Sequence, residues 1–137
     1  MKYWIECYKK YATFSGRARR KEYVFFMLFN ALIFMGVGII ADIIQPGSGK
    51  HLITILQLVS LLPGLAVFFR RMHDIGKSGL IIIPVFIFSF SWIVGNPIGN
   101  ILAIIAFVVG LAVGAMALCR KGDVGENKYG SDPKTEK

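Results

Sequence analysis

The sequence alternates between long apolar stretches and short polar segments. The four apolar stretches cover approximately residues 23–44, 52–69, 79–95 and 101–118. From residue 80 to residue 119 the chain contains no Asp, Glu, Lys or Arg. About 20 apolar helical residues cross the roughly 30 Å hydrocarbon core of a bilayer. The pattern therefore predicts an all-α integral membrane protein with four transmembrane helices in two hairpins.

Two of the predicted spans depart from a simple helix. The part of the third stretch between Leu80 and Val94 would make only about 22 Å of helix, so the sequence leaves open whether it crosses the bilayer fully. In the second span, Pro63 and Gly64 predict a kink, because proline has no backbone N–H to donate. The carbonyl that this leaves free must find another donor inside the protein.

Residues 1–16 precede the first span and predict an amphipathic surface helix followed by a turn. The aromatic face of this helix, spaced at i, i+3, i+4 and i+7, consists of Trp4, Cys7, Tyr8 and Tyr11. Lysines lie off that face, an arrangement that suits the boundary between lipid headgroups and acyl chains. The sequence also allows a helix that packs on the protein's own cytoplasmic loops.

The basic residues are distributed unevenly among the predicted loops. Of the 16 Lys and Arg residues, seven precede the first span, three lie between the second and third spans, and five occupy the polar tail, residues 120–137. Lys50 alone lies in the first outer turn, and the second outer turn has none. Since loops rich in Lys and Arg remain in the cytoplasm, both termini are predicted to be cytoplasmic.

Composition narrows the class of partner. Hydrophobic residues make up 55% of the 137-residue chain, which carries a formal charge of +8. This length accommodates a single membrane domain, residues 1–137. In so apolar a chain, basic residues beside the spans indicate anionic lipid headgroups rather than nucleic acid as the counter-surface. Cys7 and Cys119 lack a metal-binding spacing and are expected to be reduced packing residues.

Some residues within the spans are candidates for special roles. Three polar residues lie inside spans or near their ends: Asn30, Asp42 and Gln57. Asp42 is close to the outer end of the first span, where Lys50 or His51 beyond the turn can pair with it and reduce the cost of placing a carboxylate near lipid. Gly110 and Gly114 form a GxxxG pair, which suits close helix packing within the monomer or in a dimer.

Three polar segments together resemble a known family. They are residues 14–23 (FSGRARRKEY), residues 70–79 (RRMHDIGKSG), and residues 125–130 (GENKYG) followed by Asp132 and Pro133. In this order and spacing they resemble the domain of unknown function 805 family, the YhaH/YhaI-like group of small bacterial inner-membrane proteins. The resemblance covers nearly the whole chain and implies a multi-span protein of the bacterial inner (cytoplasmic) membrane, without an established activity. Val24 and Leu80 stand where the family usually has an aromatic residue.

The predicted topology places all three segments on the cytoplasmic face, where we expect them to fold together. Asp74 is available to pair with an arginine of the basic collar, residues 17–22; Ser78 can cap the third span; and His73 can bond to the tail. The cluster is either structural or a site for a phosphate, a lipid headgroup or a partner. Its candidate residues are Arg17, Arg19, Arg20, Glu22, Arg70, Arg71, His73, Asp74, Lys77, Ser78, Asn127 and Tyr129.

The sequence favours a protein that is not an enzyme. The Gly76-Lys77-Ser78 segment resembles the end of a phosphate-binding loop, but Arg71 stands where that motif needs a glycine. The two histidines, His51 and His73, are predicted on opposite sides of the membrane, so we expect neither a metal site nor a cofactor. The favoured function is a scaffold or regulatory membrane protein whose basic cytoplasmic face binds anionic lipid or a protein partner, or a second copy. The alternative is a small oligomeric transporter or channel that uses the intramembrane polar residues.

Overall fold

The computed structural model describes residues 2–89, 91–94 and 96–135. The other residues fall within the predicted segments 1–16, 79–95 and 120–137, and lie outside the described part of the chain. The α-helices are α1 (Lys2–Lys9), α2 (Arg20–Ile44), α3 (Gly49–Asp74), α4 (Ile82–Ser89) and α5 (Pro97–Cys119). Two 3₁₀ turns, η1 (Gly79–Ile81) and η2 (Ser91–Val94), flank α4.

Three of these helices, α2, α3 and α5, are long and apolar enough to cross a membrane. Only 17 to 28% of the apolar window in each of them is buried inside the molecule. Most of their Ile, Leu, Val and Phe side chains therefore face outward, which is favourable only beside lipid or another apolar surface. These long apolar helices with outward-facing side chains confirm the prediction of an all-α membrane protein.

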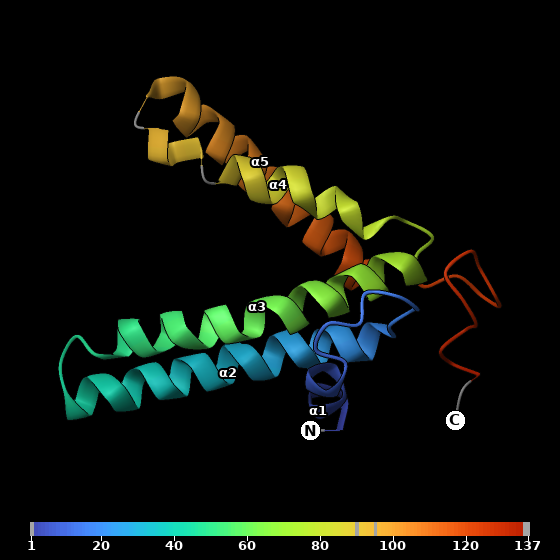
Figure 1. The fold of residues 1–137 in the computed structure, drawn as a ribbon, viewed down its shortest axis with the longest axis horizontal. Coiled ribbons are helices and arrows are strands. Elements are labelled where there is room, and N and C mark those ends of the chain that lie inside the picture. The colour runs from blue at the N-terminus through green and yellow to red at the C-terminus, as the bar shows by residue number, and fades with distance from the viewer. Residues whose placement is uncertain (1, 90, 95, 136–137) are drawn as a thin grey trace.

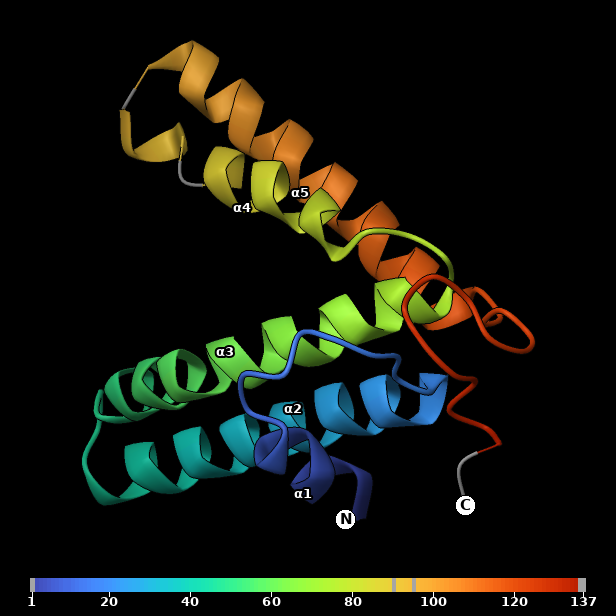
Figure 2. The same cartoon turned by 45° about the vertical axis from the view of Figure 1, so that its right-hand side comes forward.

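The helices form two antiparallel hairpins, α2 with α3 and α4 with α5 (Figure 1). The hairpins diverge from a junction where the C-terminal ends of α3 and α5 meet, and α1 lies on the side of the α2–α3 hairpin (Figure 2). The tail returns to the same junction. The polar segments of the sequence are thus gathered at one end of the molecule.

The second hairpin differs from the predicted pair of regular spans. The third apolar stretch forms η1, an α4 of only eight residues, and η2, instead of one helix. Conversely, α5 begins at Pro97, four residues before the predicted start. The Asn96 side chain caps it by accepting the N–H of Gly99 at 2.6 Å, and proline suits the first helical position because its missing N–H would be unpaired there anyway.

The turn between α2 and α3 is closed by Asp42, though not in the predicted way. The sequence allows Lys50 or His51 to pair with Asp42. Its Oδ1 instead accepts the backbone N–H groups of Gly47 at 3.1 Å and Gly49 at 2.8 Å. A carboxylate at the start of α3 satisfies amides that have no partner within the helix and interacts favourably with the helix dipole. The backbone amides are held close by the turn, whereas a lysine would have to lose side-chain freedom to reach.

The helix α1 is shorter than predicted, and its aromatic face packs on α2 and α3. Asn30 Oδ1 accepts hydrogen bonds from Trp4 Nε1 at 3.3 Å and from the Tyr8 hydroxyl at 3.0 Å. The same hydroxyl lies 2.6 Å from Ser60 Oγ. Two polar side chains of the spanning helices, Asn30 and Ser60, therefore find partners on α1, which removes much of the cost of placing them among apolar residues.

A further contact from the N-terminal segment explains how α3 tolerates a proline. Pro63 lies inside α3, so the carbonyl of Val59, four residues earlier, loses its usual donor. The Tyr11 hydroxyl donates to that carbonyl at 2.9 Å. The expectation that a neighbour would satisfy the freed carbonyl is confirmed, and the neighbour comes from the turn after α1.

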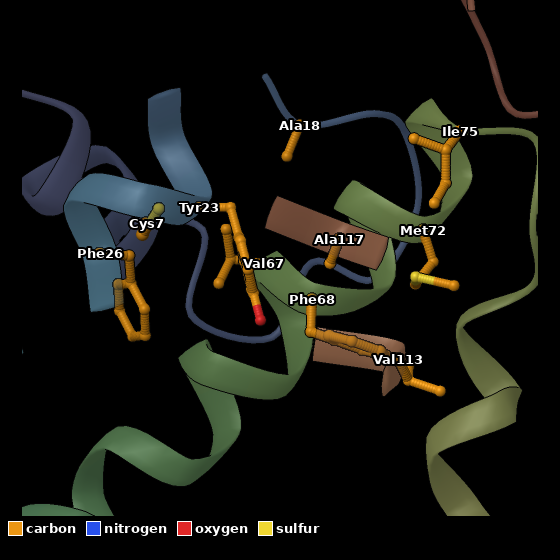
Figure 3. Close-up of a cluster of buried hydrophobic side chains, with 10 residues drawn as sticks. All are labelled: Cys7, Ala18, Tyr23, Phe26, Val67, Phe68, Met72, Ile75, Val113 and Ala117. Atoms are coloured by element: carbon orange, nitrogen blue, oxygen red, sulfur yellow. The ribbon is translucent and has the colours of Figure 1, made fainter. Parts of the chain in front are cut away.

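A buried apolar cluster fills the junction of α1, α2, α3 and α5 (Figure 3). Its members are Cys7, Ala18, Tyr23, Phe26, Val67, Phe68, Met72, Ile75, Val113 and Ala117. Burial raises the pKa of the Cys7 thiol to about 11, so this side chain remains protonated near neutral pH. Its predicted role as a packing residue agrees with this position. Cys119, by contrast, is exposed.

The two glycines of the GxxxG pair have different surroundings. A Cβ atom on Gly110 would lie 3.2 Å from a methyl group of Val85, so Gly110 permits close contact between α5 and α4 within one molecule. A Cβ atom on Gly114 would meet nothing within 4 Å among the described residues. The predicted packing role thus applies to Gly110 within the monomer.

We predict that Tyr11→Phe lowers the free energy of unfolding by about 1 kcal/mol, because it leaves the Val59 carbonyl without a donor. Pro63→Ala restores the N–H of residue 63, so the cost of Tyr11→Phe should largely disappear in the double variant. Unfolding in mixed detergent–SDS micelles gives the free energies of unfolding of the wild type, the two single variants and the double variant, which together form a double-mutant cycle. Tyr3→Phe is the control, since the Tyr3 ring stacks on Phe25 and its hydroxyl makes no hydrogen bond within the described part of the chain. Equal costs of Tyr11→Phe with and without the proline would contradict this account.

Candidate functional site

The centre of the polar cluster is Asp74, at the C-terminal end of α3. Its Oδ1 accepts a hydrogen bond from Nε of Arg17 at 3.1 Å and lies 3.0 Å from Nη2 of the same residue. Its Oδ2 accepts Nη1 of Arg71 at 2.5 Å. The side chains of all three residues are 1% exposed. The predicted pairing of Asp74 with a collar arginine is therefore present, and a second arginine from the same turn of α3 joins it.

One carboxylate cannot neutralise two guanidinium groups, and backbone carbonyls supply the remaining acceptors. Arg17 donates to the carbonyls of Asp123 and Gly125, each at 2.5 Å. Arg71 Nε donates to the carbonyl of Ala117 at 2.8 Å, and its Nη2 donates to the carbonyl of Arg120. Hydrogen bonds to a charged donor are roughly twice as strong as neutral ones. The two arginines thereby fasten the start of the tail to the ends of α3 and α5.

The tail fits around Asp74 because glycines stand at the points of closest approach. A Cβ atom on Gly122 would overlap the Asp74 carboxylate, and one on Gly76 would come within 2.8 Å of the Asp123 carboxylate. Gly76 also has a φ of +70°, a conformation that side chains disfavour. The backbone N–H of Asp123 donates to the Asp74 carbonyl at 2.7 Å. Sequence reasoning missed Gly122 and Asp123, since nothing marks them before the tail is placed.

His73 connects the α1–α2 loop with the tail. Its Nδ1 lies 3.1 Å from the carbonyl of Gly16, and its ring stacks on Tyr129 with centroids 3.9 Å apart and planes 6° from parallel. Asn127 Nδ2 donates to the His73 carbonyl at 3.0 Å. The predicted contact with the tail is thus made by ring stacking and by the backbone, whereas the imidazole bonds to the loop.

Arg19 and Glu22 organise the start of α2. The Arg19 guanidinium donates to the carbonyl of Pro133 in the tail, and its backbone N–H donates to Glu22 Oε1 at 3.3 Å. A glutamate at the third helical position commonly accepts such a bond. In the tail, Asp132 accepts the N–H groups of Gly125 and Lys134, and the bond from Lys134 contributes most to holding the pKa of its carboxyl below the ordinary value.

Arg70 has a different environment from Arg71. Its Nε donates to the Ala66 carbonyl at 3.3 Å, and its own carbonyl accepts the N–H of Ala18 at 2.9 Å. Both terminal nitrogens are buried without a hydrogen-bonded nitrogen or oxygen among the described residues, and the guanidinium lies close enough to Cys7 to oppose, in part, the rise that burial causes in the pKa of that thiol. The nearest carboxylate, of Glu22, is 4.0 Å from Nη1. This guanidinium carries a charge that the surrounding residues compensate only weakly.

The remaining candidates of the cluster lie at its surface. Ser78 caps the turn before α4 by accepting the N–H of Leu80 at 3.3 Å. The side chains of Arg20 and Lys77 are exposed. The structure therefore separates the predicted cluster into buried residues that join three segments and exposed basic residues that face outward.

The three intramembrane polar residues are not brought together. Asn30 and Gln57 line a cavity of about 350 Å³, with α2 and α3 on one side and Ile82, Gly110 and Gly114 on the other. Asp42 lies apart, at the α2–α3 turn described above. Gln57 makes no hydrogen bond within the described part of the chain, whereas the Asn30 carbonyl oxygen already has two donors from α1.

A comparison with known proteins identifies the family. The family model described as protein of unknown function (DUF805) matches residues 11–131. The chain belongs to this family. It is 35% identical over 137 residues to inner membrane protein YhaI of Escherichia coli strain K12, which covers 98% of the chain and 97% of that relative. It is 32% identical over 139 residues to inner membrane protein YhaH of the same strain, covering 99% of each. No solved structure matches the chain.

The match has a physical basis in the contacts just described. The DUF805 match includes the collar, the end of α3 and the tail up to Ser131, and these segments supply Arg17, Arg71, Asp74 and the tail carbonyls. The resemblance that the sequence motifs indicated is therefore confirmed. In this member of the DUF805 family, the motif residues meet in one buried polar cluster.

We predict that Asp74→Asn lowers the free energy of unfolding by about 3–5 kcal/mol, because it leaves two buried arginines without a charged partner. The matched control is Asp42→Asn, which keeps an oxygen acceptor for the two glycine amides and should cost less than about 1 kcal/mol. Chemical unfolding in detergent micelles measures both. Similar costs for the two substitutions would show that the Asp74 charge does not hold the cluster together.

Proposed function

We propose that this DUF805 protein is a four-span protein of the bacterial inner membrane with both termini in the cytoplasm. It acts as a non-enzymatic scaffold or regulatory protein, and its basic cytoplasmic face binds anionic lipid headgroups. The observation that carries this proposal is the division among its basic residues. Arg17, Arg70 and Arg71 are buried in the cluster, whereas basic residues next to it in the sequence are exposed, among them Arg20, Lys21, Lys77, Arg120, Lys121, Lys128 and Lys134.

The contacts of the tail support an even number of crossings. Arg17 and Arg19 precede α2, and both donate to carbonyls of the tail that follows α5. Such contacts are expected when the two ends of the membrane region lie on one side of the bilayer. The charge distribution in the sequence favours the cytoplasmic side.

The arrangement of α4 supports its assignment as part of a crossing segment. Gly79, at one end of this segment, lies against Phe69 near the polar cluster. At the other end, Ser91 Oγ donates to the carbonyl of Gly99 in the first turn of α5, at 2.8 Å. The segment thus extends along α5 from the cluster to the opposite turn, and local thinning of the bilayer can accommodate its short helix.

Binding of anionic lipid follows from the position of the exposed charges. A basic residue close to an anionic membrane surface contributes about 1 kcal/mol of attraction. Because the buried arginines already have partners inside the protein, apart from the terminal nitrogens of Arg70, this attraction comes from the exposed side chains. A membrane-protein partner with an acidic surface, or a second copy of the chain, would use the same face. The high pKa of the buried Cys7 thiol agrees with a non-catalytic role for that residue.

The alternative function, a small oligomeric transporter or channel, draws support from the cavity that Asn30 and Gln57 line. The rest of that lining is mainly apolar, and α1 already occupies the Asn30 acceptor. Solute or ion flux into liposomes that decreases on Gln57→Leu would favour this alternative over the scaffold.

We predict opposite sides for the turns and the tail. In a chain with Cys7→Ala and Cys119→Ser, single cysteines at His51 and Asn100 should react with a membrane-impermeant maleimide applied from the periplasm. A cysteine at Ser131 should react only after the membrane is permeabilised. Each variant is first checked for an unchanged melting temperature in detergent. Labelling of residues 100 and 131 from the same side would contradict four crossings.

We also predict that the exposed charges determine lipid selectivity. Native mass spectrometry of the detergent-solubilised protein should show preferential retention of phosphatidylglycerol over phosphatidylcholine. The triple variant Lys21→Gln, Lys77→Gln and Lys121→Gln should reduce that preference at least about tenfold, given the contribution expected from each charge. Lys50→Gln, at the opposite turn, is the control and should retain the preference. Unchanged retention in the triple variant would contradict the proposed role of this face.

A further inference from the structure

Asn30 has an unused hydrogen-bond donor inside the membrane region. Its side chain is 6% exposed, and its Oδ1 accepts the hydrogen bonds of Trp4 and Tyr8. Because an indole N–H can only donate, the atom of Asn30 that faces Trp4 is the oxygen, and the amide nitrogen is the other branch of the side chain. That nitrogen, Nδ2, makes no hydrogen bond to any residue in the described part of the chain.

The depth of Asn30 makes an unused donor costly. Asn30 is ten residues from Arg20, which corresponds to about 15 Å along α2. Since the hydrocarbon core of a bilayer is roughly 30 Å thick, the amide lies near its middle when the start of α2 lies at one edge of that core. Water is not present there to accept the two N–H groups, so they need an acceptor from the protein or from a ligand.

The cavity of about 350 Å³ between the two hairpins adjoins this donor. Unlike the terminal nitrogens of Arg70, Nδ2 of Asn30 is not among the fully buried atoms that lack a partner, so it retains accessible surface. Asn30 and Ser60 line the cavity, together with Gln57, whose side chain makes no hydrogen bond to a described residue. None of the described lining residues carries a charge. Four are aromatic, Tyr23, Phe26, Phe34 and Phe68, and three of these appear in Figure 3.

Gly114 leaves the α5 side of this cavity open. A Cβ atom at this position would meet nothing within 4 Å among the described residues, and Gly114 is one of the lining residues. A glycine inside a helix lowers the stability of that helix relative to other residues. The second glycine of the GxxxG pair is therefore not needed for packing within the monomer, but a side chain in its place would extend into space beside the cavity.

We infer that this Asn30 cavity binds an uncharged, membrane-soluble molecule that carries carbonyl oxygens on a planar ring, the chemistry of an isoprenoid quinone. The Asn30 amide donates to one carbonyl oxygen, and Gln57 offers its amide to another polar atom of the ligand. The aromatic side chains contact the ring. Sites for small molecules have volumes of about 300–1,000 Å³, and the cavity falls within that range.

The lining distinguishes this ligand from other molecules of the bilayer. A charged ligand would meet no opposite charge among the described lining residues. The ester carbonyls of a phospholipid lie at the edges of the hydrocarbon core, not at the depth of Asn30. This inference goes beyond the proposed function and does not depend on the binding of lipid headgroups at the basic face.

The test uses the full-length protein, purified in detergent and washed free of lipid. Because Cys119 is exposed, the probe is a fully substituted benzoquinone with an alkyl tail, which has no open ring carbon to which a thiol can add. The quinone should raise the melting temperature of the wild type, and the dependence on its concentration gives the affinity. An alkylbenzene with the same tail lacks the ring oxygens and should bind at least about fivefold more weakly, the loss expected for one hydrogen bond.

Gly114→Leu is the decisive variant. Its side chain has room to form without a clash, so the variant should fold with a melting temperature at or above that of the ligand-free wild type, and it should lose the response to the quinone. Gly36→Leu is the matched control. Gly36 also has nothing within 4 Å of its Cβ position, but it lies in α2 outside the cavity lining, so this variant should keep the response. Should Gly114→Leu fail to fold, Gln57→Leu replaces it and should weaken quinone binding about fivefold.

A spectroscopic measurement tests the role of the Asn30 amide itself. In protein labelled with ¹⁵N at asparagine, the side-chain amide resonance of Asn30 is the one that disappears in Asn30→Asp. This resonance should shift when the quinone is added and should stay in place when the alkylbenzene is added. Partition of the quinone into the micelle would not produce that difference.

Three results would overturn the inference. The first is equal affinity for the quinone and the alkylbenzene, or no response to either, since the cavity would then take at most a hydrocarbon chain without using the amide. The second is an equal response in the wild type and in Gly114→Leu, or in Gln57→Leu where Gly114→Leu is unfolded. The third is an Asn30 resonance that the quinone leaves unmoved. The lipid preference of the exposed face is measured separately with the triple lysine variant, so failure of the cavity and failure of the proposed function give different results.

Discussion

The structure depends on the buried carboxylate of Asp74. It receives Arg17 from the segment before α2 and Arg71 from its own helix, while its backbone carbonyl accepts an N–H from the tail. Three segments that are far apart in the sequence meet around one negative charge. A buried ion pair adds little to stability over an apolar alternative, but loss of one partner is costly because an uncompensated charge remains. Asp74 therefore matters more for fixing the relative positions of the three segments than for adding to the free energy of unfolding.

The membrane imposes a second constraint, because polar groups inside it must find partners within the protein. The N-terminal segment supplies several of them. Trp4 and Tyr8 bond to Asn30, and Tyr11 bonds to the carbonyl that Pro63 leaves free. The aromatic residues that an amphipathic surface helix would present to lipid thus also complete the hydrogen bonding of α2 and α3. An aromatic side chain with an apolar ring and a polar tip can contact lipid with its ring and donate a hydrogen bond to α2 or α3 with its tip.

The same principle separates the roles of the basic residues. Buried arginines bind backbone carbonyls and Asp74, since a guanidinium offers five donors in a fixed plane. Lysines, with compact and strongly hydrated charges, occupy exposed positions around the cluster. This separation assigns a structural role to the interior, and the proposal of lipid binding concerns the exterior alone. Arg70 differs from the other buried arginines, because only its Nε bonds to a carbonyl and its nearest described carboxylate, that of Glu22, is 4.0 Å away.

The sequence by itself determined the helical membrane class, the family and the gathering of its three motifs, because long charge-free stretches and clustered arginines leave few alternatives. It also indicated the pairing of Asp74 with a collar arginine and the need to satisfy a carbonyl freed by Pro63. Only the tertiary structure decided that Asp42 caps α3 through Gly47 and Gly49, that α4 is short, that Gly122 must lack a side chain, and that Arg71, not Arg70, joins Asp74. Hydrophobic pattern is a local property of the chain, whereas hydrogen-bond partners and close contacts depend on distances between segments that only packing sets.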